Sequence, residues 1–172
     1  MKNKVLNRWN SLDPAMAARE VLPCCGSQAW ADALASKRPF SNEKSLIEIS
    51  SSIWSTLPEQ AWQEAFDSHP RIGQSHAQAH ATNESLQWSA QEQHTVLTAD
   101  DAMKNALNEA NQNYEQKFGR IFIVCATGKT LSEILAILET RMKDDAQTEL
   151  LEAAEQQRQI TELRLRRWLE ST

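Results

Sequence analysis

The sequence predicts an all-α protein, a single-domain, multi-helix bundle with one short extended apolar segment. Four glycines and five prolines are the only strong helix breakers among 172 residues, so long helices are favoured. Apolar residues recur at intervals of three and four along most of the chain, as on one face of a helix. Residues 121–126 differ, because they are continuously apolar and rich in β-branched side chains. No repeat or change in composition marks a second domain, so we expect one domain over 1–172.

Capping residues indicate where the first helices begin. Asp13 followed by Pro14 is typical of an N-cap and a first helical position, and it predicts a helix over 14–22. A second helix is expected over 27–37, where a tryptophan and a leucine four residues apart share a face.

Two more helices are expected before the middle of the chain. Ser41 or Asn42 is suited to cap the first of them. The second begins at Pro58 and ends at His69-Pro70, because proline disfavours helical geometry in the residue before it.

The middle of the chain is polar. Residues 70–87 have few apolar anchors and are expected to form a long loop, a feature that is usually functional or disordered. Ser89-Ala90-Gln91-Glu92 then matches the S-x-x-E capping box, which predicts a helix start.

Three further elements follow. A helix is expected from Asp100 through Tyr114, ending near Phe118-Gly119. After the extended segment of 121–126, Thr130-x-x-Glu133 matches a second capping box. A last helix of about 24 residues should run to Leu169, with boundaries good to about two to four residues.

Charge and composition exclude several partner classes. The net charge of −5 and the pI near 5.4 argue against nucleic acid, which needs a basic face. No stretch approaches the roughly 18 apolar residues of a membrane helix, and the start has no apolar leader. Three cysteines fit a reducing compartment, so a cytoplasmic protein is expected. A homodimer is compatible with the sequence, which does not determine the oligomeric state.

Three motifs have a catalytic interpretation and a simpler structural one. His76 and His80 have the i, i+4 spacing of two metal ligands, but H-E-x-x-H is absent and no third ligand is obvious, so a solvated loop is favoured. Cys125 could be a nucleophile, although its apolar setting favours a small buried hydrophobe. Gly128-Lys129-Thr130 resembles only the tail of a phosphate-binding loop.

His69 stands at a helix end and is followed by Pro70, Gly73 and the polar stretch. A histidine there is held by the scaffold and can face a cleft, the position expected of a general acid or base. Position alone does not distinguish this role from a structural one.

Several motifs occur together in one order along the chain. They are Cys24-Cys25-Gly26-Ser27, Trp30, Arg38-Pro39-Phe40, His69-Pro70-Arg71-Ile72-Gly73, Ser89-Ala90-Gln91-Glu92-Gln93, Asn113-Tyr114, Lys117-Phe118-Gly119, Phe122 to Gly128 and Arg164-Leu165. This order resembles, end to end, that of the 2-oxo-4-hydroxy-4-carboxy-5-ureidoimidazoline (OHCU) decarboxylase family.

The resemblance implies an enzyme of urate breakdown that forms (S)-allantoin and CO2 without a cofactor or metal. The catalytic residues would be His69 as proton donor, Glu92 as carboxylate and Arg164 on the last helix. The other residues implied to bind the ureidoimidazoline substrate are Pro70, Ser89, Ala90, Gln91, Gln93, Phe122, Ile123, Val124, Cys125 and Ala126. The transthyretin-like hydrolase domain of some relatives has no counterpart here, so only decarboxylation is expected. The roles of His76, His80 and Arg120 stay open.

The residue types suit this chemistry. The substrate's own imine can take up the electron pair left by CO2, so an acid, a carboxylate and an arginine would suffice. Backbone groups of the extended segment could bind the amide-like edges of the ring. The alternatives are a helical binding module without catalysis, which has no need of His69, Glu92 and Arg164 together, and a metal-dependent hydrolase built on His76 and His80.

Overall fold

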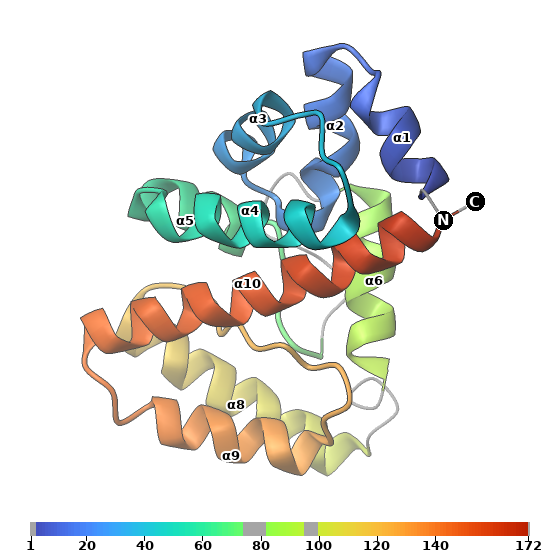
Figure 1. The fold of residues 1–172 in the computed structure, drawn as a ribbon. Helices are drawn as coiled ribbons and strands as arrows, with labels where there is room; N and C mark the ends of the chain where they lie inside the picture. Colours follow the sequence, from blue (N-terminus) through green and yellow to red (C-terminus); the bar gives the residue numbers. More distant parts are fainter. Residues whose placement is uncertain (1–2, 74–81, 95–99, 172) are drawn as a thin grey trace. The chain divides into compact units, whose positions relative to one another are not determined.

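The computed structural model describes residues 3–73, 82–94 and 100–171. Within these ranges the chain forms helices and no strand, so the predicted all-α class is confirmed. His76 and His80 lie outside the described residues. The helices are α1 (Lys4–Asn10), α2 (Pro14–Cys25), α3 (Gln28–Ser36), α4 (Glu43–Thr56), α5 (Glu59–Asp67), α6 (Asn83–Glu92), α8 (Asp101–Phe118), α9 (Leu131–Arg141) and α10 (Ala146–Glu170) (Figure 1).

Most of the predicted helix starts are confirmed by their capping bonds. Asp13 accepts a hydrogen bond from the backbone N–H of Met16 at the start of α2, and Asn42 does the same for Ser45 at the start of α4. Thr130 and Glu133 form both bonds of the capping box that opens α9.

Two predicted boundaries are wrong. Helix α2 does not stop at Leu22 but continues through Pro23 to Cys25, where Gly26 ends it in the left-handed conformation (φ 89°). Helix α6 does not start at Ser89. It starts after Thr82, whose side chain accepts from the N–H of Ser85, so residues 83–87 are helical and not part of a loop. Helix α1 was not predicted.

The chain forms two compact units, which are described separately. The first comprises residues 1–65 and 158–172, and the second comprises residues 66–157. Helix α10 contributes residues to both. No helix in the described ranges is both long and apolar enough to span a membrane.

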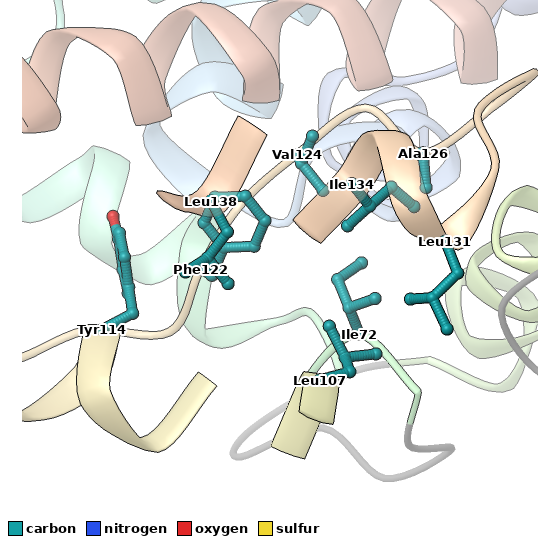
Figure 2. Close-up of a cluster of buried hydrophobic side chains, with 9 residues drawn as sticks. All are labelled: Ile72, Leu107, Tyr114, Phe122, Val124, Ala126, Leu131, Ile134 and Leu138. Atoms are coloured by element: carbon teal, nitrogen blue, oxygen red, sulfur yellow. The ribbon is translucent and has the colours of Figure 1, made fainter. Parts of the chain in front are cut away.

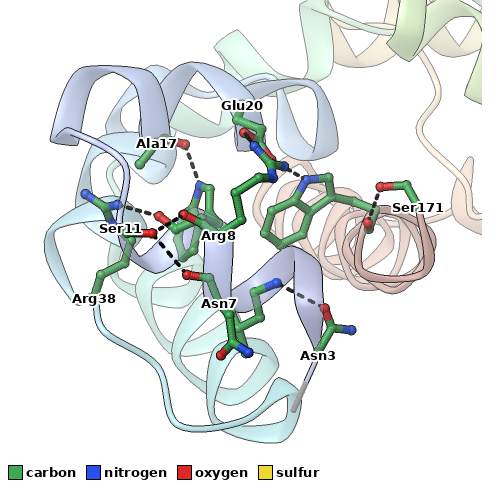
Figure 3. A network of polar contacts seen from close by, with 11 residues as sticks. Asn3, Asn7, Arg8, Ser11, Ala17, Glu20, Arg38 and Ser171 are labelled. Carbon is green, nitrogen blue, oxygen red and sulfur yellow. Dashed lines mark hydrogen bonds and ion pairs between the residues drawn. The ribbon is translucent and has the colours of Figure 1, made fainter. Parts of the chain in front are cut away.

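The first unit is organised around a fully buried tryptophan, Trp9. Its indole N–H donates to the carbonyl oxygen of Ala17 at 2.9 Å, and its ring contacts Phe40 and Trp168. Figure 3 shows the polar contacts around it, including Glu20, which pairs with Arg8 and also accepts from the indole N–H of Trp168 at 3.0 Å. These contacts join the two ends of the chain within this unit.

The second unit has an apolar core between α8, α9 and the extended segment 121–126 (Figure 2). Side chains of an extended chain alternate in direction, so Phe122, Val124 and Ala126 enter this core together. They pack against residues of α8 and α9, namely Leu107, Tyr114, Leu131, Ile134 and Leu138. All six residues of 121–126 are buried and none is helical, which agrees with the prediction of a buried non-helical apolar segment.

Candidate active site

His69 lies two residues beyond the end of α5 and is 6% exposed. Its backbone N–H donates to the carbonyl oxygen of Phe66 at 3.1 Å, which continues the turn of the helix. Its Nε2 atom lies 2.6 Å from Oε1 of Gln157, a residue of α10 with no exposed surface. His69 is therefore held both through its backbone and through its imidazole ring.

The segment that follows His69 is held from two helices. Arg71 forms an ion pair with Glu115 of α8 at 2.6 Å, and Asn111 of the same helix donates to the carbonyl oxygen of Ile72 at 3.1 Å. The N–H of Gly73 donates to Oε1 of Gln93 at 2.9 Å. Such bonds hold an irregular segment in one conformation, because they satisfy its backbone and charged groups within the protein.

Residues 89–93 lie at the C-terminal end of α6 and not at a helix start, which corrects the expectation from the sequence. Ser89 and Gln93 are buried, Ala90 and Gln91 are exposed, and Glu92 is half-buried as the last residue of the helix. The bond between Gln93 and Gly73 brings this end of α6 to the segment that begins with His69-Pro70. These two predicted groups therefore lie in one unit and are connected.

The extended segment 121–126 is bound through its backbone on one side. The carbonyl oxygen of Ile123 accepts from Arg141 at 2.6 Å, and the N–H of Cys125 donates to Gln156 at 2.9 Å. The carbonyl oxygen of Cys125 accepts from Lys129 at 2.7 Å. These three groups are bonded within the protein and hold the segment in place.

Val124 lies between Ile123 and Cys125 and differs from both in its backbone hydrogen bonding. Within the described part of the chain its N–H and C=O make no hydrogen bond, although the residue is only 3% exposed. Backbone groups that are buried without a partner are rare in native proteins. An amide-like edge of a small molecule would supply one donor and one acceptor to this pair.

Arg141 fixes the segment through a buried charged network. Its guanidinium forms an ion pair with Glu149 of α10, lies 4.5 Å from the ring centroid of Phe122, and is 4% exposed. The hydroxyl of Tyr114 also donates to Glu149. Burial and this hydrogen bond to a carboxylate raise the pKa of Tyr114, so the phenol stays protonated.

Arg164 lies in the first unit, whereas His69, Glu92 and the extended segment lie in the second. It is 1% exposed, so its side chain faces inward on the last helix. One guanidinium nitrogen donates to the carbonyl oxygen of Pro23 at 3.3 Å, near the end of α2. Burial raises the pKa of the neighbouring Cys25 thiol to about 12, so Cys25 is not a nucleophile at neutral pH.

Sequence reasoning missed Gln156 and Gln157, which bind Cys125 and His69 from adjacent positions of α10. A signal for Gln157 was present. It lies seven residues before Arg164 and three before Ile160, so it belongs to the same inward stripe of the helix. A polar residue on such a stripe needs a hydrogen-bonding partner.

The described residues contain no group of three or more histidine, cysteine or acidic side chains placed to hold a metal ion. The fold and site thus define a class of protein: an all-helical protein in which adjacent residues of one helix, Gln156 and Gln157, bind a buried extended segment and a buried histidine. Within this class, the family model for OHCU decarboxylase matches residues 10–166, and the chain belongs to the OHCU decarboxylase family.

Individual relatives agree with this assignment. The chain is 31% identical to the 2-oxo-4-hydroxy-4-carboxy-5-ureidoimidazoline decarboxylase of Amia calva, over 85% of this chain and 80% of that protein. It is 33% identical to the uric acid degradation bifunctional protein TTL of Arabidopsis thaliana, over 83% of this chain. This chain spans only 44% of that bifunctional protein.

A solved structure gives the same result for the fold. A crystal structure of OHCU decarboxylase in the presence of (S)-allantoin matches with a TM-score of 0.76 and 31% sequence identity. The match covers 88% of this chain and 98% of that one.

Proposed function

We propose that the protein decarboxylates 2-oxo-4-hydroxy-4-carboxy-5-ureidoimidazoline to (S)-allantoin and CO2. The observation that supports this most is the match to nearly the whole length of an OHCU decarboxylase crystallised in the presence of (S)-allantoin. The anchored His69 is the chemical feature of this chain that such a reaction needs.

The proposed reaction is balanced without a co-reactant. Cleavage of the bond to the carboxylate releases CO2, and its electron pair forms a C=C bond to the adjacent imine carbon. The C=N bond becomes a single bond as its electron pair moves to the nitrogen, which takes up a proton. The hydroxyl then loses its proton and becomes the carbonyl of allantoin, while the neighbouring carbon is protonated on one face. In sum, one proton replaces CO2.

Two residues of the second unit have catalytic roles in this proposal. His69 donates the proton, and Glu92 accepts hydrogen bonds from the hydroxyl and ureido groups of the substrate. Pro70 and the residues at the end of α6 would line the substrate. The backbone groups of Val124, which have no partner among the described residues, would bind an amide-like edge of the ring. Arg164 is proposed as a further residue that substrate turnover requires, and it is tested separately.

The cytoplasmic location and the homodimer, both expected from the sequence, belong to this proposal. A cytoplasmic location is supported by Cys24, Cys25 and Cys125, all within the described ranges, none of which forms a disulfide. The homodimer stays a prediction.

The direct test is to generate the unstable substrate from urate in situ and to follow the circular dichroism of the allantoin formed. We expect faster formation of (S)-allantoin than in the uncatalysed control, with no change in EDTA, because the imine of the substrate takes up the electrons. Racemic allantoin at the uncatalysed rate would refute the function, and loss of activity in EDTA would favour the metal-dependent alternative.

A further inference from the structure

The contact between His69 and Gln157 is a buried hydrogen bond between two side chains of the second unit. The distance from Nε2 to Oε1 is 2.6 Å, and the two residues are 6% and 0% exposed. A carboxamide oxygen only accepts hydrogen bonds. With this oxygen facing the ring, Nε2 must carry the hydrogen.

We propose that Gln157 is a positioning residue that sets the tautomer of His69. The neutral imidazole is held with its hydrogen on Nε2, and Nδ1 is the nitrogen that gains and loses a proton. The consequence for decarboxylation rests on the proposed function: His69 donates to the substrate from Nδ1, in its imidazolium form.

A neutral amide suits this role because it binds the ring in both charge states. Nε2 carries a hydrogen in the neutral tautomer and in the imidazolium, so the bond to Gln157 persists while Nδ1 changes its protonation. A carboxylate at this position would instead stabilise the imidazolium and hold the proton on the ring.

Gln157 has no exposed surface, and the residue before it is also bonded. Its neighbour Gln156 accepts from the N–H of Cys125 and donates to Glu152 one turn earlier, both at 2.9 Å. The same turn of α10 therefore holds the imidazole through Gln157 and the extended segment through Gln156. A shift of this turn would displace both groups, and misplacement by about 1 Å can cost about 10²-fold in rate.

The test measures the tautomer by nitrogen-15 NMR of the ring in the protein without substrate, at a pH where His69 is neutral. A His69→Phe variant identifies the signal. We expect a protonated Nε2 and an unprotonated Nδ1 in the wild-type protein. A ring protonated at Nδ1 would overturn the proposal without the need for any variant.

Two replacements then test the dependence on Gln157. Gln157→Met keeps the volume but lacks the carboxamide, so the tautomer preference should be lost and kcat should fall about tenfold to 10²-fold, with KM changing less. Gln157→Glu keeps an acceptor oxygen and should retain the hydrogen on Nε2. Gln147→Met, at an exposed position of the same helix, is the matched control and should change neither quantity.

An unchanged tautomer together with wild-type kcat in Gln157→Met would overturn the proposal. The proposed function can fail independently of it. If the wild-type protein does not accelerate (S)-allantoin formation but its tautomer still depends on Gln157, the positioning role stands and the assigned substrate is wrong.

Discussion

His69 and Glu92 lie in the same unit but differ in their surroundings, and we expect both to be essential for turnover. His69 is buried and anchored, whereas Glu92 is half-buried at the end of α6. We expect His69→Ala and Glu92→Ala each to lower kcat by about 10²-fold or more, the scale of a positioned acid–base group. Circular dichroism should show that both variants keep their helices.

His76→Ala distinguishes this assignment from the metal-dependent alternative. The sequence predicts that the replacement leaves kcat nearly unchanged, because His76 belongs to neither predicted catalytic motif. If His76→Ala were as damaging as His69→Ala, the assignment of the acid would be wrong.

Arg164 is buried, whereas Arg167 is only half-buried on the same helix. A buried guanidinium has a specific set of partners, and lysine cannot reproduce its planar fork. We expect Arg164→Lys to lower kcat/KM by about tenfold or more and Arg167→Lys to change it little. Both are measured by the circular dichroism assay, with urea unfolding in parallel.

The parallel measurement is needed because Arg164 also donates to the carbonyl oxygen of Pro23. A loss of stability without a loss of kcat/KM in Arg164→Lys would limit the residue to packing within the first unit. Wild-type kinetics in Arg164→Ala would remove it from the catalytic residues.

At the scale of elements, the extended segment depends on the buried pair of Arg141 and Glu149. Arg141→Met removes the donor to Ile123 and leaves a buried carboxylate without its cation. We expect a loss of about 3–5 kcal/mol in the free energy of unfolding, measured in urea, because an uncompensated buried charge is costly.

The matched control is Arg166→Met, which removes an arginine from an ion pair with Glu162 near the surface. Exposed pairs contribute about 1 kcal/mol or less. Equal losses in the two variants would show that the Arg141 network does not support the segment.

Elements that depend on residues a few positions apart could be predicted from the sequence, whereas elements that depend on distant residues could not. The cap at Asp13, the capping box of Thr130 and Glu133, and the extended segment each depend on residues a few positions apart. Ser89-x-x-Glu92 satisfies the same capping pattern, but the helix has already begun after Thr82. A motif that matches locally does not start a helix where the preceding residues are helical.

The site shows the same limit. The histidine and its motif could be identified by resemblance, but the pairing of His69 with Gln157 joins positions 88 residues apart. Periodicity along α10 places Gln157 on an inward face and thereby indicates that it has a partner. It does not say which partner, because that depends on how the helix packs within its unit.

At the scale of the whole molecule, one helix is common to both compact units. Helix α10 provides Glu149 and Gln157 to the second unit, and Ile160 and Trp168 to the first. Loss of this helix would remove buried contacts from both units at once. The prediction of a single domain over 1–172 therefore has a specific consequence, namely that the two units unfold together.

The cysteines allow the unfolding of each unit to be measured separately. Cys24 and Cys25 report on the first unit and Cys125 on the second. All three are buried, and burial raises the pKa of Cys25 to about 12, so the native thiols should not react with iodoacetamide at neutral pH. We expect all three to become reactive over the same range of urea, when labelling is followed by mass spectrometry of the separate peptides.

A Cys125→Ala variant with an unchanged midpoint for Cys24 and Cys25 controls for perturbation by the label. Two distinct midpoints in the wild-type protein would contradict the single domain and would show that each unit unfolds by itself.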